Sequence, residues 1–175
     1  SFREVDQDGN WYWTYGGDYG PKDVPSFGNF CCNGLVNAVR EPHPHLLEVK
    51  KIYQNIKSTL VDKKNLTIRV KNWFDFSDLN EYLLHWSVTG DDGTIVAEGS
   101  KEVTCAPHAV VDITLGAVKL PKTLREAYLN LSWTRVKATP LVTSDWEVAY
   151  DQFVLPVSKN SWSGKPAKAG NTTFV

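Results

Sequence analysis

The chain has 175 residues and a formal net charge of −1, with 42% hydrophobic and 22% charged residues. These values are ordinary for a globular domain, and so small a net charge gives no reason to expect nucleic acid or an anionic membrane as a partner. No run approaches the roughly 18 apolar residues that a membrane span requires. The cysteines are odd in number and two are adjacent, so we expect buried free thiols at Cys31, Cys32 and Cys105 rather than a disulfide framework.

Residues 9–34 are dense in glycine and aromatic side chains and hold no period of 2 or 3.6 for long. This pattern predicts a long, irregular loop, and structureless loops beyond about 15 residues are usually functional. At its start, Asp6-Gln7-Asp8-Gly9-Asn10 superficially resembles a calcium-binding loop. It lacks a third ligand before the glycine and a closing glutamate, so we interpret it as a plain turn.

One short helix is predicted over residues 44–54. Pro44 suits the first helical turn, where its missing N–H leaves no hydrogen bond unmade. Leu46, Val49 and Tyr53, spaced i, i+3 and i+7, form an apolar stripe, and two lysines lie toward the C-terminal end, where the helix dipole favours positive charge.

From about residue 55 onward, short runs of alternating polarity are separated by turns. They lie near residues 55–61, 66–71, 84–88, 94–97, 111–115, 129–134 and 147–155. The sequence Asp91-Asp92-Gly93 is typical of a hairpin turn between two of them. Strands with one apolar face each bury it when two sheets pack face to face. The pattern therefore predicts a mainly β fold, an immunoglobulin-like β-sandwich of about seven strands.

No group of side chains indicates a self-contained catalytic centre. A glycosidase needs two carboxylates about 5–10 Å apart on rigid supports. The acids of the aromatic loop, Asp18 and Asp23, lie in a Gly/Pro-rich segment that does not hold them at a defined separation, so we expect both to cap turns. His43 and His45 are candidate metal ligands, but no third ligand lies nearby in the sequence, so a structural role is favoured.

Three linked motifs in the first 45 residues resemble family 2 β-galactosidases. They are Tyr15-Gly16-Gly17-Asp18-Tyr19-Gly20, Gly28-Asn29-Phe30-Cys31-Cys32-Asn33-Gly34-Leu35-Val36 and Arg40-Glu41-Pro42-His43-Pro44. These match that family's GGDFG, NFCxNGLV and R-x-PHP elements in order and in spacing. The resemblance continues through Trp73-Phe74-Asp75-Phe76, Tyr82-Leu83-Leu84-His85-Trp86 and Gln152-Phe153 to about residue 156.

The resemblance implies a division of the chain into three parts. Residues 1–55 look like the end of a catalytic TIM barrel, with its last active-site loop and final helix, and residues 56–156 like the Ig-like domain that follows. Residues 157–175 are expected to be a linker or tail. In such barrels the active site lies at the C-terminal ends of the strands. Both catalytic glutamates of the family lie upstream, so we expect a retaining β-galactosidase in the intact bacterial protein and no activity in this chain alone.

Supporting site residues carry over from the family by motif. The resemblance implies that the backbone carbonyl of Phe30 and the side-chain oxygen of Asn33 bind a sodium ion, which in turn contacts a galactosyl hydroxyl, and that Phe30 lines the galactose pocket. Oxygen donors suit such a hard cation. A third ligand, an Asp, lies upstream, so sodium is expected only in the intact enzyme. Magnesium is also implied there, although residues 21–27 depart from the commoner family form and no ligand role is assigned to them.

A second class of function is a non-catalytic carbohydrate-binding or interaction module, because sandwiches with exposed Trp often stack on sugars. Trp73, Trp86 and Trp133 fit inward strand positions, which favours core packing, while Trp146 and Trp162 are less constrained. In the enzyme hypothesis, the Trp11 and Trp13 neighbourhood helps to shape the sugar site. The expected partners are then a β-galactoside, the rest of the parent chain and further copies in a homo-oligomer, in a bacterial cytoplasm or periplasm.

Overall fold

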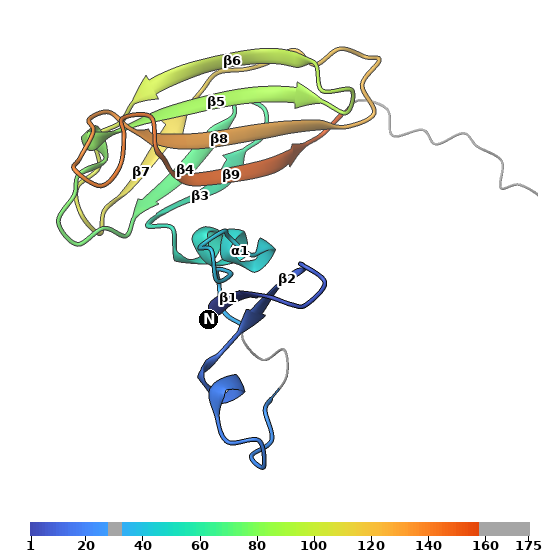
Figure 1. The fold of residues 1–175 in the computed structure, drawn as a ribbon. Coiled ribbons are helices and arrows are strands. Elements are labelled where there is room, and N and C mark those ends of the chain that lie inside the picture. Colours follow the sequence, from blue (N-terminus) through green and yellow to red (C-terminus); the bar gives the residue numbers. More distant parts are fainter. Residues whose placement is uncertain (28–32, 158–175) are drawn as a thin grey trace, which may run out of the picture. The chain divides into compact units, whose positions relative to one another are not determined.

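Residues 1–27 and 33–157 are described by a computed structural model, in which the chain divides into two units between Gln54 and Asn55 (Figure 1). The first unit holds β1 (Phe2–Val5), β2 (Trp11–Thr14), the 3₁₀ helix η1 (Gly16–Tyr19) and α1 (Pro44–Tyr53). The second holds β3 (Ile56–Asp62), β4 (Thr67–Asn72), the 3₁₀ helix η2 (Leu79–Glu81), β5 (Tyr82–Gly90), β6 (Ile95–Glu102), β7 (Val110–Thr114), β8 (Ala127–Arg135) and β9 (Glu147–Leu155). None of these helices is long and apolar enough to cross a membrane.

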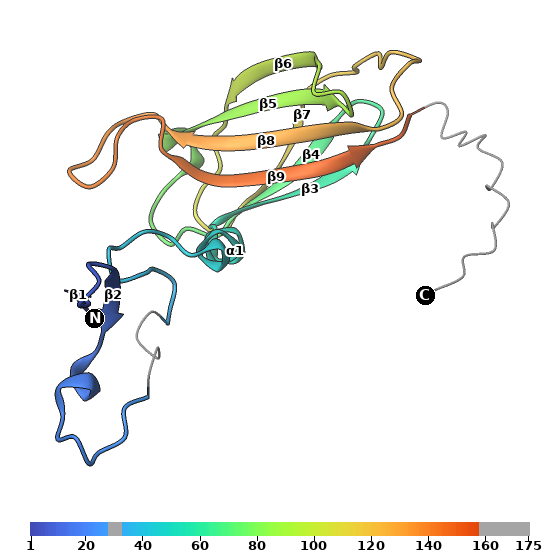
Figure 2. The same cartoon turned by 45° about the vertical axis from the view of Figure 1, so that its right-hand side comes forward.

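The second unit is a β-sandwich, and all seven predicted strands are present in it. One sheet has the strand order β3-β4-β7 and the other β6-β5-β8-β9, with every neighbouring pair antiparallel. The two sheets form separate layers when viewed from two directions (Figures 1 and 2). The chain places β3 and β4 in one sheet, β5 and β6 in the other, and then returns to the first sheet with β7. Such crossing between layers is also found in immunoglobulin-like domains.

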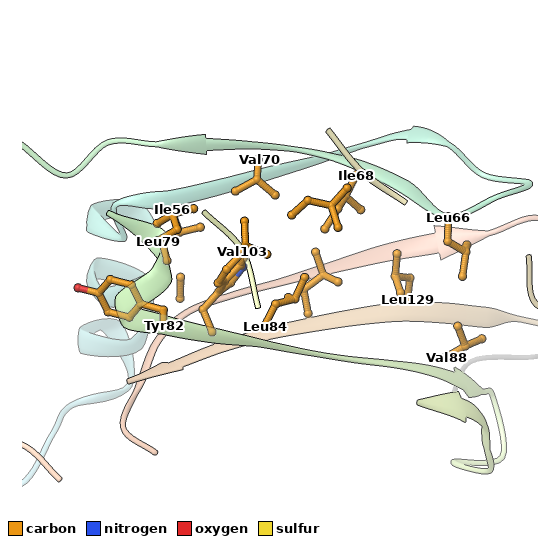
Figure 3. Close-up of a cluster of buried hydrophobic side chains, with 14 of the residues drawn as sticks. Ile56, Leu66, Ile68, Val70, Leu79, Tyr82, Leu84, Val88, Val103 and Leu129 are labelled. Atoms are coloured by element: carbon orange, nitrogen blue, oxygen red, sulfur yellow. The ribbon is translucent and has the colours of Figure 1, made fainter. Parts of the chain in front are cut away.

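The apolar faces of the two sheets meet in one core. Ile68 and Val70 of β4 face Leu84 and Val88 of β5, and all four side chains are fully buried (Figure 3). Trp133 of β8 is also fully buried and is the largest side chain in this cluster. Burying one such aliphatic side chain stabilises the fold by about 1.5–3 kcal/mol, so this alternation supplies most of the driving force for folding of the sandwich.

The β5–β6 hairpin turns where the sequence predicts it. The Gly90 N–H donates to the Thr94 carbonyl at 2.9 Å, and the Asp92 carboxylate accepts from the Thr94 N–H at 2.9 Å. The bond from the Thr94 backbone is the main reason why the pKa of Asp92 is lowered. Gly93 has φ +81°, a left-handed conformation that costs glycine little.

The predicted inward positions hold for two of the three tryptophans. Trp133 is in the core, and Trp86 is half-buried and packs against it, with its ring over Gly99 of the edge strand β6. The prediction for Trp73 is wrong: its side chain is 47% exposed, and the Lys71 ammonium lies 3.6 Å from the centre of its ring. Trp73 lies just beyond the end of β4, where strand alternation no longer dictates which side chain is buried.

A buried asparagine fastens the loops at one end of the sandwich. Asn72 is fully buried; its Nδ2 donates to the Ser77 and Cys105 carbonyls, both at 2.9 Å, and its Oδ1 accepts from the Phe74 N–H at 2.9 Å. One side chain thereby satisfies three backbone groups of two separate loops. The Cys105 thiol is free and buried, as predicted, and burial raises its pKa. Cys31 and Cys32 lie outside the described residues.

The outer face of the three-stranded sheet carries a charged pair. Arg69 of β4 and Asp112 of β7 are directly opposite in register, and Nε and one terminal nitrogen of the guanidinium each donate to a carboxylate oxygen at 2.8 Å. Both side chains are about half exposed. The guanidinium lowers the pKa of Asp112, first through its hydrogen bonds and then through its charge.

The first unit corrects the prediction that residues 9–34 are irregular throughout. Strands β1 and β2 form an antiparallel hairpin in which Phe2 pairs with Thr14 and Val5 with Trp11. Aromatic residues follow one another in β2 and most hairpin side chains are exposed, so the two faces do not differ in polarity and no period of 2 is visible. The plain turn predicted at Asp6 is confirmed as the connection, since the Asp6 carboxylate accepts from the Asn10 N–H at 2.7 Å.

The predicted helix is confirmed as α1. Its first residue is Pro44, and Lys50 and Lys51 lie in its last turn. The expected apolar stripe is only partly covered: Leu46 and Val49 are half-buried, while Tyr53 is exposed. No residue of α1 is fully buried. Because short helices depend on tertiary packing, α1 is less stabilised by burial than the strands of the sandwich.

Replacing Asn72 by alanine should destabilise the sandwich by about 2–3 kcal/mol, because the Ser77 carbonyl and the Phe74 N–H lose this partner and the Cys105 carbonyl keeps only the Leu79 N–H. Urea unfolding followed by tryptophan fluorescence measures this. Asn80→Ala is the matched control, since Asn80 is exposed at the surface of the same region. A loss below about 1 kcal/mol for Asn72→Ala would contradict the fastening role.

Replacing Arg69 by glutamine should raise the pKa of Asp112 toward the ordinary aspartate value of about 3.9. A lowered native pKa stabilises the fold above the unfolded-state pKa, and this contribution disappears as the pH falls through the native pKa. The unfolding free energies of wild type and Arg69→Gln should therefore differ near neutral pH and converge in acid. Titration of the Asp112 carboxyl carbon by NMR measures the shift, and an unchanged titration in the variant would refute the pairing.

Candidate active-site loop

The residues predicted to support a sugar site lie in the segment between η1 and α1. Phe30 is outside the described residues, so its predicted roles stay predictions. Asn33 is described and exposed. The next residue, Gly34, has φ +108°, a conformation that side-chain-bearing residues rarely adopt. The chain therefore bends sharply beside the one predicted ligand that can be located.

A short turn that is closed by its own hydrogen bonds follows Gly34. Val36 and Pro42 form an antiparallel bridge, and the Asn37 N–H donates to the Glu41 carbonyl at 2.9 Å. The Asn37 side chain closes this turn, because its Oδ1 accepts from the Val39 and Glu41 N–H groups at 3.0 and 2.9 Å. Its Nδ2 also donates to the Glu41 carboxylate at 2.8 Å. The segment is thus held by polar bonds rather than by a core.

Both candidate metal-binding histidines instead contact the backbone of this loop. His43 Nδ1 lies 2.8 Å and His45 Nε2 lies 2.7 Å from the Gly34 carbonyl oxygen. The centres of the two rings are 5.4 Å apart. No group of three or more His, Cys, Asp or Glu side chains that could hold a metal ion occurs in residues 1–27 and 33–157.

Asp18 has the capping role predicted for it. One carboxylate oxygen accepts from the Tyr15 N–H at 2.9 Å, and the other accepts from the Ser26 hydroxyl. The Ser26 hydrogen bond, and then the Tyr15 backbone bond, lower the pKa of Asp18. Asp23 is exposed in the segment after η1, near the turn in which the Val24 N–H donates to the Pro21 carbonyl at 3.0 Å.

The aromatic hairpin is joined to η1 by a chain of hydroxyl contacts. The Tyr19 hydroxyl donates to the Glu4 carboxylate at 2.7 Å and lies 2.6 Å from the Thr14 hydroxyl. Tyr19 also meets Phe2 edge to face, with ring centres 5.9 Å apart. These contacts connect both strands of the hairpin to the Gly-Gly-Asp-Tyr segment of η1.

A hollow of about 330 Å³ lies on the same unit and is lined by Arg3, Trp11, Tyr12, Trp13, Val39 and Glu41. The Arg3 guanidinium lies 4.0 Å from the centre of the Trp11 ring, a cation–π contact. Trp11 is 60% exposed even so. Aromatic rings exposed to this extent, together with a few polar groups, are typical of a surface that another body covers.

The oxygen atoms of this segment differ in how far neighbouring groups already engage them. Asn33 is an exposed residue whose amide oxygen is of the type that binds a hard cation, while the Asp18 carboxylate already accepts hydrogen bonds from neighbouring donors. Sequence reasoning missed the contacts of His43 and His45 with Gly34. The only signal for them was the presence of two histidines near a glycine, because their convergence depends on the left-handed φ of Gly34.

Each of the two units of the chain contains a match to a model of a known protein family. Residues 68–156 match the family model of β-galactosidase domain 4, and residues 1–58 match that of the glycosyl hydrolases family 2 TIM barrel domain. A β-galactosidase of Priestia megaterium is 37% identical over 163 residues, 92% of this chain and 16% of that protein. A β-galactosidase of Aeromonas hydrophila is 35% identical over 155 residues, 87% of this chain and 15% of that protein.

The chain therefore spans about 15% of the length of the curated relatives that it matches. The match to domain 4 covers the sandwich from β4 to β9, whereas the hairpin, η1, α1 and the first residues of β3 lie within the part matched to the barrel domain. On these grounds the chain belongs to the β-galactosidases of glycoside hydrolase family 2.

Proposed function

We propose that the intact protein hydrolyses terminal β-galactosides with retention of configuration, and that this chain supplies part of the wall and support of its active site. The observation that carries the proposal is the loop around Asn33: it lies within the part matched to the barrel domain, it bends at Gly34, and Asn33 beside the bend is exposed. The relatives bear the name β-galactosidase.

The chemistry of retaining glycosidases indicates which part of the protein holds the catalytic residues. Such enzymes need an acid/base and a nucleophile with carboxyl groups about 5–5.5 Å apart. In this chain Asp18 accepts hydrogen bonds from Tyr15 and Ser26, which lower its pKa, so it is a poor proton donor at neutral pH. We therefore assign both catalytic carboxylates to the part of the protein upstream of this chain.

Asn33 and Phe30 are proposed to bind sodium and to face the galactosyl group in the intact protein. A bound sodium ion would hold a sugar hydroxyl by direct contact with its oxygen. The amide oxygen of Asn33 is a suitable donor for such an ion, and its exposure leaves it accessible. We also propose that the rest of the parent chain covers the exposed rings of Phe2, Trp11 and Tyr19.

Hydrolysis of a chromogenic β-galactoside should be absent for this purified chain and present when the chain is extended upstream through the whole barrel. In the extended protein, Asp23→Asn should leave kcat/KM unchanged within about twofold, because Asp23 is exposed and is given no role in the chemistry. Hydrolysis by the short chain, abolished in Asp23→Asn, would instead mean that the catalytic carboxylates lie in the aromatic segment.

One observation favours a second candidate function, a carbohydrate-binding module. The outer face of the four-stranded sheet has a depression of about 820 Å³, lined by His85, Trp86, Ser87, Glu98, Gly99, Ser100, Asn130, Leu131, Ser132, Glu147, Tyr150, Asp151 and Gln152. Its polar side chains are ordered by cross-strand bonds, such as Gln152 to Asn130 at 2.7 Å and Ser132 to Glu147 at 2.7 Å. Such mixed donors and acceptors suit a neutral, hydroxyl-rich ligand.

If this second function holds, titration with a galactose-containing oligosaccharide should shift the amide NMR signals of β5, β8 and β9, and Asn130→Ala should weaken binding by about tenfold. Trp146→Ala is the control, since Trp146 is absent from the lining of the depression. Trp162, the other tryptophan considered, lies outside the described residues. If sugar at tens of millimolar shifts no signal, the sandwich is not a sugar-binding module.

A further inference from the structure

Two imidazole rings converge on one backbone carbonyl beside Asn33. His43 Nδ1 and His45 Nε2 lie 2.8 and 2.7 Å from the Gly34 oxygen. A carbonyl oxygen only accepts hydrogen bonds, so both of these ring nitrogens carry a proton. In the neutral state His43 is therefore the Nδ1–H tautomer and His45 the Nε2–H tautomer. The two lone pairs of the Gly34 oxygen are then both used.

We propose that His43 and His45 form a bracket that positions Asn33. The bracket consists of their two bonds to the Gly34 carbonyl, and it fixes the peptide plane that follows Gly34. The inference rests on the proposed role of Asn33 as a cation and sugar contact and adds two positioning residues to it. Neither histidine touches the substrate in this scheme.

The start of α1 is the base of the bracket. His43 is the residue immediately before α1, and His45 is the second residue of the helix. The His43 N–H also donates to the Leu35 carbonyl at 3.0 Å. Two consecutive carbonyls, those of Gly34 and Leu35, are thus attached to the start of one helix. The chain that follows Gly34 cannot move relative to the start of α1 without breaking these bonds, so Asn33 is attached through Gly34 to a fixed point.

The conformation of Gly34 explains why such a bracket is needed. With φ +108° and no Cβ, Gly34 alone imposes little restriction on the direction of the chain. The turn beyond it is closed by Asn37 and Glu41, so most of the remaining freedom lies at Gly34. Fixing its carbonyl from two sides limits the positions that the side chain of the preceding residue, Asn33, can reach.

The same geometry argues against a metal site formed by these two side chains. The nitrogens that face Gly34 are protonated and have no lone pair for a metal. Only His43 Nε2 and His45 Nδ1 remain, and no third ligand joins them within the described residues. Hydrogen bonding to the shared Gly34 carbonyl therefore explains the close spacing of the two histidines better than metal binding does.

The bracket makes a prediction about protonation that does not depend on activity. In this 175-residue chain at about pH 8, long-range ¹H–¹⁵N NMR should show His43 protonated at Nδ1 and His45 at Nε2. The reverse assignment, or tautomer mixtures in both rings, would overturn the bracket.

Function is tested in the chain extended through the barrel, with sodium chloride as the probe and potassium chloride holding the ionic strength constant. His43→Ala and His45→Ala should each raise the sodium concentration for half-maximal activity by roughly threefold to tenfold, the equivalent of one lost hydrogen bond. The kcat at saturating sodium should change little. In an Asn33→Ala background, the same substitutions should have no further effect on the sodium requirement.

Conservative variants separate positioning from general stability. His43→Asn and His45→Gln place an amide N–H near the position of the lost ring N–H and should restore the wild-type sodium requirement. His43→Gln and His45→Asn place the amide N–H at a different distance from the backbone than the lost ring N–H, so they should not restore the wild-type sodium requirement. An unchanged sodium requirement in both alanine variants would overturn the bracket alone. A wild-type extended enzyme indifferent to sodium would overturn the proposed role of Asn33, and the function of the bracket with it.

Discussion

The sandwich depends on one constraint: seven strands, each apolar on one side, bury that side only by facing another sheet. Ile68 and Val70 on one sheet and Leu84 and Val88 on the other satisfy it directly. The polar features of this unit lie at the ends and on the outer faces of the two sheets. Asn72 closes the loops at one end, and the Arg69–Asp112 pair occupies an outer face that the core leaves to solvent. The depression of the four-stranded sheet likewise lies on an outer face, where side chains of neighbouring strands bond to one another.

The first unit is held together in another way. It has a hairpin and one short helix, and α1 has no fully buried residue. Its shape comes from polar contacts: Asp6 closes the hairpin, Asp18 caps η1, Asn37 closes the loop, and two histidines hold Gly34. Individual hydrogen bonds contribute only about 1 kcal/mol net, so such a unit is weakly stabilised unless a larger body covers its aromatic rings. This agrees with the match of residues 1–58 to a barrel domain.

The fold was largely predictable because alternation reports burial directly. Strands containing Ile68, Leu84 or Leu129 place every second side chain in the core, and the run that follows Pro44 shows the spacing of a helix. The hairpin of the first unit was missed because Trp11, Tyr12 and Trp13 are consecutive aromatics, which hides the period of 2. Trp73 was placed wrongly because its burial is decided at a strand end. The histidine contacts follow from one left-handed glycine, and no periodicity reports φ.

The pairing of Trp86 with Gly99 bears on how the edge of the sandwich tolerates mutation. A Cβ at position 99 would lie only 3.0 Å from Nε1 of Trp86, so even alanine would press against the ring. Since β6 is an edge strand, a displaced Trp86 would present a large apolar surface beside unpaired backbone groups, the combination from which edge-to-edge aggregation starts. Sequence drift at this partly exposed position is thus restricted by the solubility of the protein as well as by its stability.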